Sequence, residues 1–286
     1  MTSYFSLPLK LTSAAVAGFT LAASPALALE VTVNPTNPRL GDTISTVIQL
    51  EDSASPPTVT LNGQSYAAFQ IGGNRYRALL PTTPLDRPGS RSVQVEGDGQ
   101  TRNLNLQLRD RDFAVQRIRV AGGGDNATEM ELARVAAFKA LVTPEKFWSG
   151  PFLKPTSGSV STEFGVRRYY NGVFAQDYYH RGVDYAASTG TPVIAPAGGR
   201  VALVGRESEG FRLHGNVVGI DHGQGVVSIF LHLSRINVKE GDVVRAGQQI
   251  GAVGSTGAAT GPHLHWGLYV NGSAIDPVPW RYTGIE

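Results

Sequence analysis

The sequence predicts a mainly β protein, with an N-terminal immunoglobulin-like β-sandwich followed by a C-terminal antiparallel β-sheet domain. Seven short strand-like runs fill residues 31–110, and all six histidines lie after residue 151. From that point Gly is dense and Val/Ile runs alternate with turns. At 286 residues the chain is long enough for two modest domains, each with its own core.

The composition excludes several classes of function. Lys and Arg total 25 against 23 Asp and Glu, so no nucleic acid or other polyanionic partner is expected. The chain has no cysteine, which excludes disulfides, thiolate nucleophiles and Cys-based zinc sites. Any metal ion must therefore be held by histidine and carboxylate side chains.

Residues 1–28 are predicted to be a secretory signal peptide. Lys10 is its only charge, an apolar run extends from Leu11 to Ala23, and Ala26-Leu27-Ala28 fits a cleavage site. The run is short for a membrane span, which takes roughly 20 apolar residues, although an uncleaved anchor is the alternative. No cysteine follows to carry a lipid, so no stable membrane anchor is expected. The mature chain is predicted to act in the periplasm or outside the cell, in the cell wall.

Residues 29–110 are predicted to form the β-sandwich module. Its seven runs are separated by Pro, Gly, Asn and Asp, and read VTVN, TISTVIQL, TVTLNG, YAAFQI, RYRALL, SVQVEG and NLNLQL. The module holds no histidine and its charges are scattered, so we find no catalytic constellation in it. A binding or spacing module and a plain structural domain are equally consistent with this part of the sequence.

Residues 111–150 are predicted to be a connector that contains one helix. Gly122-Gly123-Gly124 forms a flexible break, and the spacing from Thr128 to Val142 is helical. Thr128-x-x-Glu131 fits a capping box, and Pro144 ends the segment. The apolar positions of this helix are Met130, Leu132, Val135, Ala136 and Phe138. They predict that the helix packs against a domain and does not form a site.

The last domain, residues 151–286, contains a His-x-His pair. In the run His263-Leu264-His265-Trp266, alternation along a strand places the two imidazoles on one face and Leu264 and Trp266 on the other, which suits a core. By itself the pair is weak evidence for a site, because such a pair on a strand is more often a solvated polar face.

Two further segments carry candidate site residues. In His180-Arg181-Gly182-Val183-Asp184, Gly182 permits a turn and Asp184 points away from its apolar neighbours; a metal or an ordinary Asp–His hydrogen bond would satisfy it. His232 closes an apolar strand, where a histidine is often a core residue. Three His and Asp ligands plus water would form the open tetrahedral site of a catalytic zinc. The helical HExxH motif of other zinc peptidases is absent.

The other histidines and a cluster of polar aromatics have no assigned chemistry. His222 is predicted to lie in a turn, and His214 in a loop before a strand. A substrate groove and a solvated loop with packed rings are both open for Arg167, Arg168, Tyr169, Tyr170, Tyr178 and Tyr179.

Residues 150–280 resemble the lysostaphin-like zinc endopeptidases of bacterial cell walls, the M23 peptidase family. The resemblance rests on five ordered motifs: STEFGVRRYYNG, HRGVDYAA, IFLHLS, VKEGDVVRAGQQIGAVGSTGAATGPHLHW and IDPVPW. It implies an antiparallel β-sheet metallopeptidase domain of the duplicated hybrid motif type, with a groove over one sheet and the metal on its floor.

The resemblance also implies the roles of five residues. His180, Asp184 and His265 become the ligands of one Zn²⁺, and His263 and His232 become the catalytic pair. The chain departs from the family at Phe230, where Tyr is frequent, and at Gly267, where Glu often follows the aromatic. Neither departure removes a site residue.

The function implied is that of a secreted zinc metalloendopeptidase that hydrolyses peptide bonds in peptidoglycan cross-links or stem peptides. His263 would act as general base, and His232 would donate to the oxyanion or to the leaving amine. One alternative is a non-catalytic, wall-binding amidase activator of the same fold, which predicts missing ligands. A secreted protease of ordinary proteins is also open. The run Val238–Gly247 resembles a lipoyl or biotinyl carrier hairpin, but the lysine tripeptide of such carriers is absent.

Overall fold

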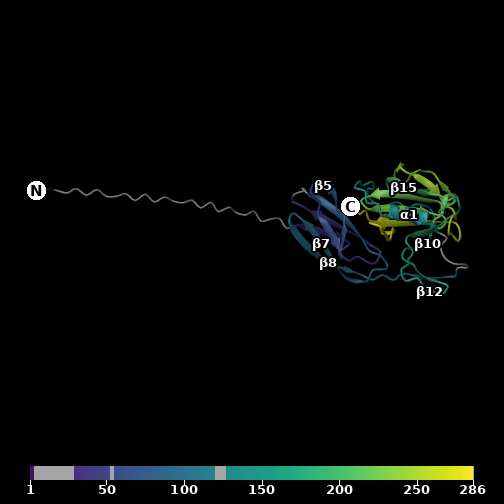
Figure 1. The fold of residues 1–286 in the computed structure, drawn as a ribbon, viewed down its shortest axis with the longest axis horizontal. Coiled ribbons are helices and arrows are strands. Elements are labelled where there is room, and N and C mark those ends of the chain that lie inside the picture. Colours follow the sequence, from purple (N-terminus) through teal and green to yellow (C-terminus); the bar gives the residue numbers. More distant parts are fainter. Residues whose placement is uncertain (3–28, 52–54, 120–126, 286) are drawn as a thin grey trace.

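The computed structural model describes residues 1–2, 29–51, 55–119 and 127–285, and it is mainly β, as the sequence predicts. In Figure 1 the N-terminal strands, in purple and blue, lie beside a green and yellow C-terminal body. Apart from its first two residues, the predicted signal peptide lies outside the described residues. The predicted glycine break at residues 122–124 lies outside them as well.

Two four-stranded antiparallel sheets form the N-terminal module. In spatial order, the first holds β1 (Glu30–Asn34), β2 (Thr43–Gln49), β6 (Arg75–Pro81) and β5 (Phe69–Gly72). The second holds β4 (Gln64–Tyr66), β3 (Thr58–Leu61), β7 (Gly89–Gly97) and β8 (Gln100–Leu108). Both sheets contribute to one apolar core that includes Ile48, Val59, Leu80 and Val95. The two sheets therefore form a sandwich, and an immunoglobulin-like topology for it stays a prediction.

The described residues of this module form eight strands, one more than the seven predicted. The run at residues 66–71 is divided, because Tyr66 ends β4 and Phe69 begins β5, which belong to different sheets. Ala67 and Ala68 form the crossing between the sheets. Apolar pattern alone does not show such a crossing, because the run is continuous in composition.

The predicted connector helix is present as α1 (Glu129–Lys139). Thr128 and Glu131 form the expected capping box, but the helix ends three residues before Val142. The predicted buried face is partly wrong, because Met130 and Leu132 are 41 % and 49 % exposed. The buried positions are those of Val135, Phe138 and, unexpectedly, Glu131. Among the described residues, no helix has the length and apolar character needed to cross a bilayer.

The C-terminal body is built on an eight-stranded antiparallel sheet. Its order is β10 (Ser159–Thr162), β13 (Val183–Ala186), β21 (His263–Val270), β17 (Val226–Leu231), β16 (Val217–Gly223), β15 (Gly199–Gly205) and β19 (Val243–Val244), with β22 (Ser273–Ile275) also on β21. The three central strands are buried along almost their whole length. Helix α1 packs against β15 (Figure 1). This sheet is the rigid base of the candidate site.

Two small sheets complete the C-terminal body. One holds β12 (Val173–Phe174), β11 (Arg167–Tyr170) and β9 (Val115–Ile118), and the other β14 (Pro192–Ile194), β20 (Gln249–Ala252) and β18 (Arg235–Ile236). Two 3₁₀ turns, η1 (Glu207–Glu209) and η2 (Pro279–Arg281), lie in loops. Strand β9 comes from the connector and pairs in parallel with β11, so the connector is part of this body.

Buried polar contacts join the sandwich to the C-terminal body. Arg77 of β6 is 1 % exposed, donates to the side chain of Gln224 and to the carbonyl of Ile285, and lies over the ring of Trp148. Asn271 donates from Nδ2 to the carbonyl of Leu79 at 2.7 Å. A buried charge needs such partners, so these contacts define how the two parts dock.

His222 is not in a turn, which corrects the sequence prediction. It lies in β16 and is fully buried. Its Nδ1–H donates to the carbonyl of Gly198 at 2.7 Å, and Nε2 accepts from Ser228 Oγ at 2.8 Å. Trp266 Nε1 also donates to Ser228 Oγ, at 3.3 Å. His222 is therefore a core residue with satisfied hydrogen bonds, and burial lowers its pKa to about 4.

This buried histidine makes stability depend on pH. In the unfolded chain its pKa is 6.5 and in the fold about 4, so the unfolded state binds more protons between these values. Above about pH 6.5 the protonation of His222 does not reduce the free energy of unfolding. Between about pH 6.5 and about pH 4 the free energy of unfolding decreases with decreasing pH, by at most about 1.4 kcal/mol per pH unit. We expect urea unfolding of His222→Gln to give a flatter dependence of the unfolding free energy on pH in this window. A slope equal to that of the unchanged protein would contradict the prediction.

Candidate metal centre

Two neighbouring strands place a carboxylate and an imidazole directly opposite each other. Asp184 of β13 pairs in register with His265 of β21. Side chains of directly opposed residues lie on the same face of a sheet, and His265 Nδ1 lies 2.8 Å from Asp184 Oδ1. Val183 and Trp266, the next pair in the register, are buried in the core on the other face. The alternation predicted from the sequence is confirmed for these residues.

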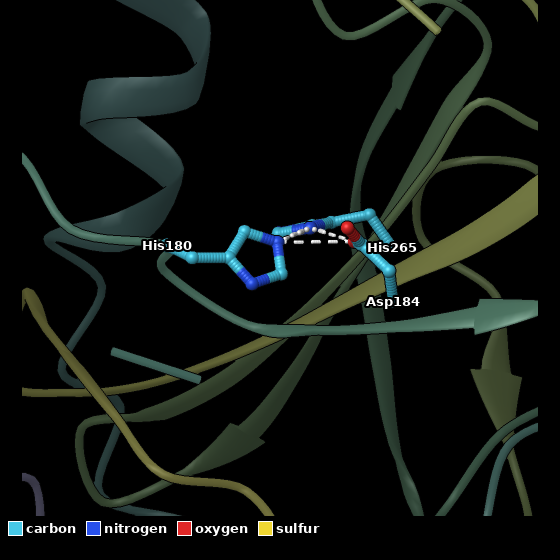
Figure 2. Close-up of side chains that lie close together, drawn as sticks. All are labelled: His180, Asp184 and His265. Carbon is cyan, nitrogen blue, oxygen red and sulfur yellow. Dashed lines mark hydrogen bonds and ion pairs between the residues drawn. The ribbon is translucent and has the colours of Figure 1, made fainter. Parts of the chain in front are cut away.

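His180 reaches the same point from the segment before β13. Its backbone N–H donates to the carbonyl of Val166, and its own carbonyl accepts from the N–H of Gly165, both at 2.9 Å. Its Nε2 lies 3.0 Å from Asp184 Oδ1 and 3.1 Å from His265 Nδ1. Figure 2 shows the three side chains pointing toward one another.

The glycine between His180 and Asp184 is required by packing. A Cβ at Gly182 would lie 2.4 Å from the carbonyl oxygen of Trp266 and 2.8 Å from His265 Nε2. The ring of His265 therefore lies directly against this backbone. The turn predicted at Gly182 brings the two residues together because no side chain separates the two segments.

The donor set fits a metal ion. The three atoms are 2.8–3.1 Å apart, close to the edge of about 3.3 Å in a tetrahedron with bonds of 2.0–2.1 Å. His180 Nδ1–H donates to the carbonyl of Glu163 at 2.8 Å, which leaves Nε2 with its lone pair toward the cluster. A cation between the three atoms would satisfy lone pairs that otherwise repel one another.

The electrostatics hold these groups in the forms that coordinate metals. Burial alone would raise the pKa of Asp184, but its contacts with His180 and His265 outweigh burial and hold that pKa well below the usual range. Burial lowers the pKa of His265 to about 4, against the opposing effect of Asp184. A metal site needs an ionised carboxylate and neutral imidazoles, and Asp184 and His265 take these forms at neutral pH.

The remaining two predicted residues, His263 and His232, lie beside this cluster. His263 Nε2 is 3.9 Å from Asp184 Oδ1, and its Nδ1–H donates to the carbonyl of Gly261 at 2.8 Å. The ring centroid of His232 is 4.7 Å from that of His263, and His232 Nδ1–H donates to the carbonyl of Thr256 at 2.8 Å. The structure thus brings together all five residues singled out in the sequence.

The backbone of His232 explains how its ring reaches this face. Leu231 is opposite His265, so regular alternation would point the next side chain to the core face. Strand β17 ends at Leu231, however, and His232 has a φ of +63°. This left-handed conformation is rare for a residue other than glycine and breaks the alternation. Burial, together with the nearby His265, lowers its pKa to about 4.

The arginine and tyrosine residues singled out in the sequence have different environments in the structure. Tyr179 is 4 % exposed and donates from its hydroxyl to the carbonyl of Ala274, so it belongs to the core and does not line a groove. Arg168 donates to the hydroxyl of Tyr178 at 2.8 Å and lies over its ring. Nothing here assigns a substrate contact to them.

Sequence reasoning missed the groups that orient the histidine rings. They are the backbone carbonyls of Glu163, Thr256 and Gly261, each of which accepts from an Nδ1–H. A carbonyl leaves no side-chain signal, so no pattern in the sequence could have identified these three.

Comparison with known proteins supports a metallopeptidase domain. Residues 178–277 match the model of peptidase family M23. The chain is 34% identical over 174 residues to an uncharacterized metalloprotease of Haemophilus influenzae, over 60% of this chain and 35% of the relative. It is 42% identical over 118 residues to the peptidoglycan DD-endopeptidase ShyC of Vibrio cholerae, over 41% of this chain and 26% of the relative. The chain therefore spans about a third and about a quarter of the length of these relatives.

A solved structure is similar over more of the chain. A protein from Pseudomonas aeruginosa assigned to peptidase M23 superposes with a TM-score of 0.65 at 28% sequence identity. The likeness covers 87% of this chain and 96% of that one, so it extends into the N-terminal module. Motifs, fold and family model agree that the domain containing His180, Asp184 and His265 is a domain of peptidase family M23.

Proposed function

We propose that this chain is a zinc-dependent endopeptidase that hydrolyses peptide bonds in the cross-links or stem peptides of bacterial peptidoglycan. The observation that carries the proposal is the complete cluster of His180, Asp184 and His265, with two further imidazoles beside it. The name of the Vibrio cholerae relative, a peptidoglycan DD-endopeptidase, supports the substrate class. A non-catalytic amidase activator of this fold would not need the complete set.

In this proposal His180, Asp184 and His265 hold one Zn²⁺ per chain through Nε2, Oδ1 and Nδ1. Two nitrogens and one carboxylate oxygen suit zinc, and three protein ligands leave a coordination position open for catalysis. When bound, zinc supplies polarisation of the scissile carbonyl and lowers the pKa of the attacking water to about 7.

The tautomers of the other two histidines support their roles. Because His263 and His232 each donate Nδ1–H to a backbone carbonyl, each neutral ring offers an unprotonated Nε2. We assign His263 Nε2, 3.9 Å from Asp184, as the acceptor of the water proton. His232 donates a proton from Nε2 to the oxyanion or the leaving amine only after that nitrogen has taken one up. This refines the simple donor role expected from the sequence.

We place the enzyme in the periplasm or in the cell wall outside the cell, after removal of residues 1–28. The support for this placement is the signal-like sequence and the location of the proposed substrate. The sandwich module, residues 29–110, would hold or orient the peptidase domain, residues 151–286, through the contacts of Arg77.

The function can be tested on purified peptidoglycan. The mature protein is incubated with peptidoglycan, with and without a chelator, and the released fragments are identified by mass spectrometry. We expect new peptide amino termini that disappear with the chelator and return when zinc is restored. Fragments cleaved in the glycan, or no fragments at all, would reject an endopeptidase. Cleavage of casein at an equal rate would instead indicate a general protease.

The zinc content of variants distinguishes the proposed metal ligands from the proposed catalytic pair. We expect His265→Ala to lose stoichiometric zinc, because Asp184 then lacks its opposed nitrogen. The matched control is His263→Ala, two residues away on the same strand, which should keep one zinc per chain. Inductively coupled plasma mass spectrometry after dialysis measures both. Stoichiometric zinc in the His265 variant would show that the ligand assignment is wrong.

Turnover should fall in variants that keep the metal. His263→Ala removes the proton acceptor and is expected to lower kcat by about 10²–10⁴-fold. His232→Ala removes the second ring and is expected to lower kcat by about 10²–10³-fold. Rates on soluble peptidoglycan fragments, normalised to bound zinc, give the comparison. A zinc-loaded variant with unchanged kcat would exclude its residue from the chemistry.

A further inference from the structure

The carboxylate of Glu131 is buried in the C-terminal body, although its helix belongs to the connector. Glu131 is 0 % exposed. It accepts hydrogen bonds from three consecutive backbone amides, those of Arg212, Leu213 and His214, at 3.0, 3.1 and 2.7 Å. His214 Nδ1–H also donates to it, at 2.7 Å. One side chain therefore holds the whole turn at residues 212–214.

This contact is more than a helix cap. In the capping box the side chain of Glu131 accepts only one bond, from the N–H of Thr128, and this bond is 3.3 Å long. The shorter hydrogen bonds to this carboxylate all come from the turn at residues 212–214, so its main interaction is with the turn and not with the helix cap. Burial opposes its ionisation, but the hydrogen bonds from His214 and Leu213 outweigh burial and lower the pKa of Glu131. The carboxylate is thus ionised, and its charge strengthens each bond.

The same turn holds His232 of the candidate site. The carbonyl of His214 accepts from the backbone N–H of His232 at 3.1 Å. The ring of His232 donates to the carbonyl of Thr256, and Thr256 Oγ1 in turn accepts from the N–H of Asn216 at 2.9 Å. Gly215 lies so close to Thr256 that a Cβ there would be 2.5 Å from it. Both groups that orient His232 are therefore tied to the segment 214–216.

His232 depends on such support because of its backbone. Its φ of +63° is a left-handed conformation, which is unfavourable in free energy for any residue other than glycine. Such a conformation persists only where the surrounding structure imposes it. If the turn at residues 212–214 moved, both the N–H bond and the ring orientation would be lost. Strand β17 cannot replace them, because it ends at Leu231.

We propose that Glu131 is a positioning residue for His232: its carboxylate fixes the turn at residues 212–214, and the turn fixes the backbone and ring of His232. The inference rests on the proposed peptidase function for its rate effect, but not for its structural effect. It makes α1 part of the working site, although α1 lies outside the residues that match the family model, 178–277. Glu131 touches no substrate in this role.

The test compares three full-length variants. Glu131→Ala removes all the acceptors, and Glu131→Gln keeps one acceptor oxygen but removes the charge. Glu129→Ala is the matched control, since Glu129 is an exposed acid in the same first helical turn. For each variant we measure bound zinc, kcat and KM on soluble peptidoglycan fragments, and the imidazole NMR signals of His232 with ¹⁵N-labelled histidine.

We expect Glu131→Ala to keep one zinc per chain and an unchanged KM, while kcat falls about 10²-fold, the effect of a catalytic group displaced by about 1 Å. Glu131→Gln should lie between Glu131→Ala and the unchanged protein, and Glu129→Ala should equal the unchanged protein. The hydrogen-bonded Nδ1–H signal of His232 should weaken or broaden in the same order.

The result that overturns the proposal is a His232 signal and a kcat in Glu131→Gln and Glu131→Ala that equal those of Glu129→Ala. Loss of zinc in step with kcat would also overturn it, because the effect would then be general to the site. If Glu131→Ala does not fold, Glu131→Gln decides by the same two readouts. If the unchanged protein does not cleave peptidoglycan, the proposed function fails, while the NMR signal of His232 still tests the positioning role.

Discussion

The cross-strand pair of Asp184 and His265 is the constraint on which the rest of the site depends. The two residues are opposite each other in the ladder between β13 and β21, so the sheet itself brings their side chains within 2.8 Å. A slip of one residue in this register would turn one of them into the core and bring Val183 or Trp266 to the site face. The buried faces of Val183 and Trp266 thus help to specify the register that forms the centre.

Around this pair, backbone carbonyls decide the chemistry of the imidazoles. Three rings donate Nδ1–H to the carbonyls of Glu163, Gly261 and Thr256, so each presents an unprotonated Nε2 to the site. Fixed rings lose little freedom on binding a metal or a substrate, and their tautomers need not change. The backbone of the folded chain therefore fixes the orientation of these three rings.

The folded C-terminal body is larger than the span that matches the family model, residues 178–277. Strand β9 extends the small sheet that precedes His180, and α1 inserts Glu131 beneath the turn that supports His232. The sandwich adds Arg77, whose buried guanidinium binds Gln224 and the carbonyl of Ile285. Each of these segments completes a polar contact that the C-terminal sheet does not provide alone. The connector and the sandwich therefore both pack against the C-terminal body through buried polar contacts.

The sequence by itself determined the β class of the chain, the connector helix with its capping box, and the five residues that gather at the site. The strands and the helix follow from local rules, namely alternation along β21 and the cap at Thr128, whereas the five site residues come from the resemblance of ordered motifs to the M23 family. Only the tertiary structure decided the division of residues 66–71 between two sheets, the strand position of His222, and the burial of Glu131. It also decided the left-handed backbone of His232. These features depend on contacts between distant segments and on backbone groups, which are the same in every residue and leave no mark in the order of side chains.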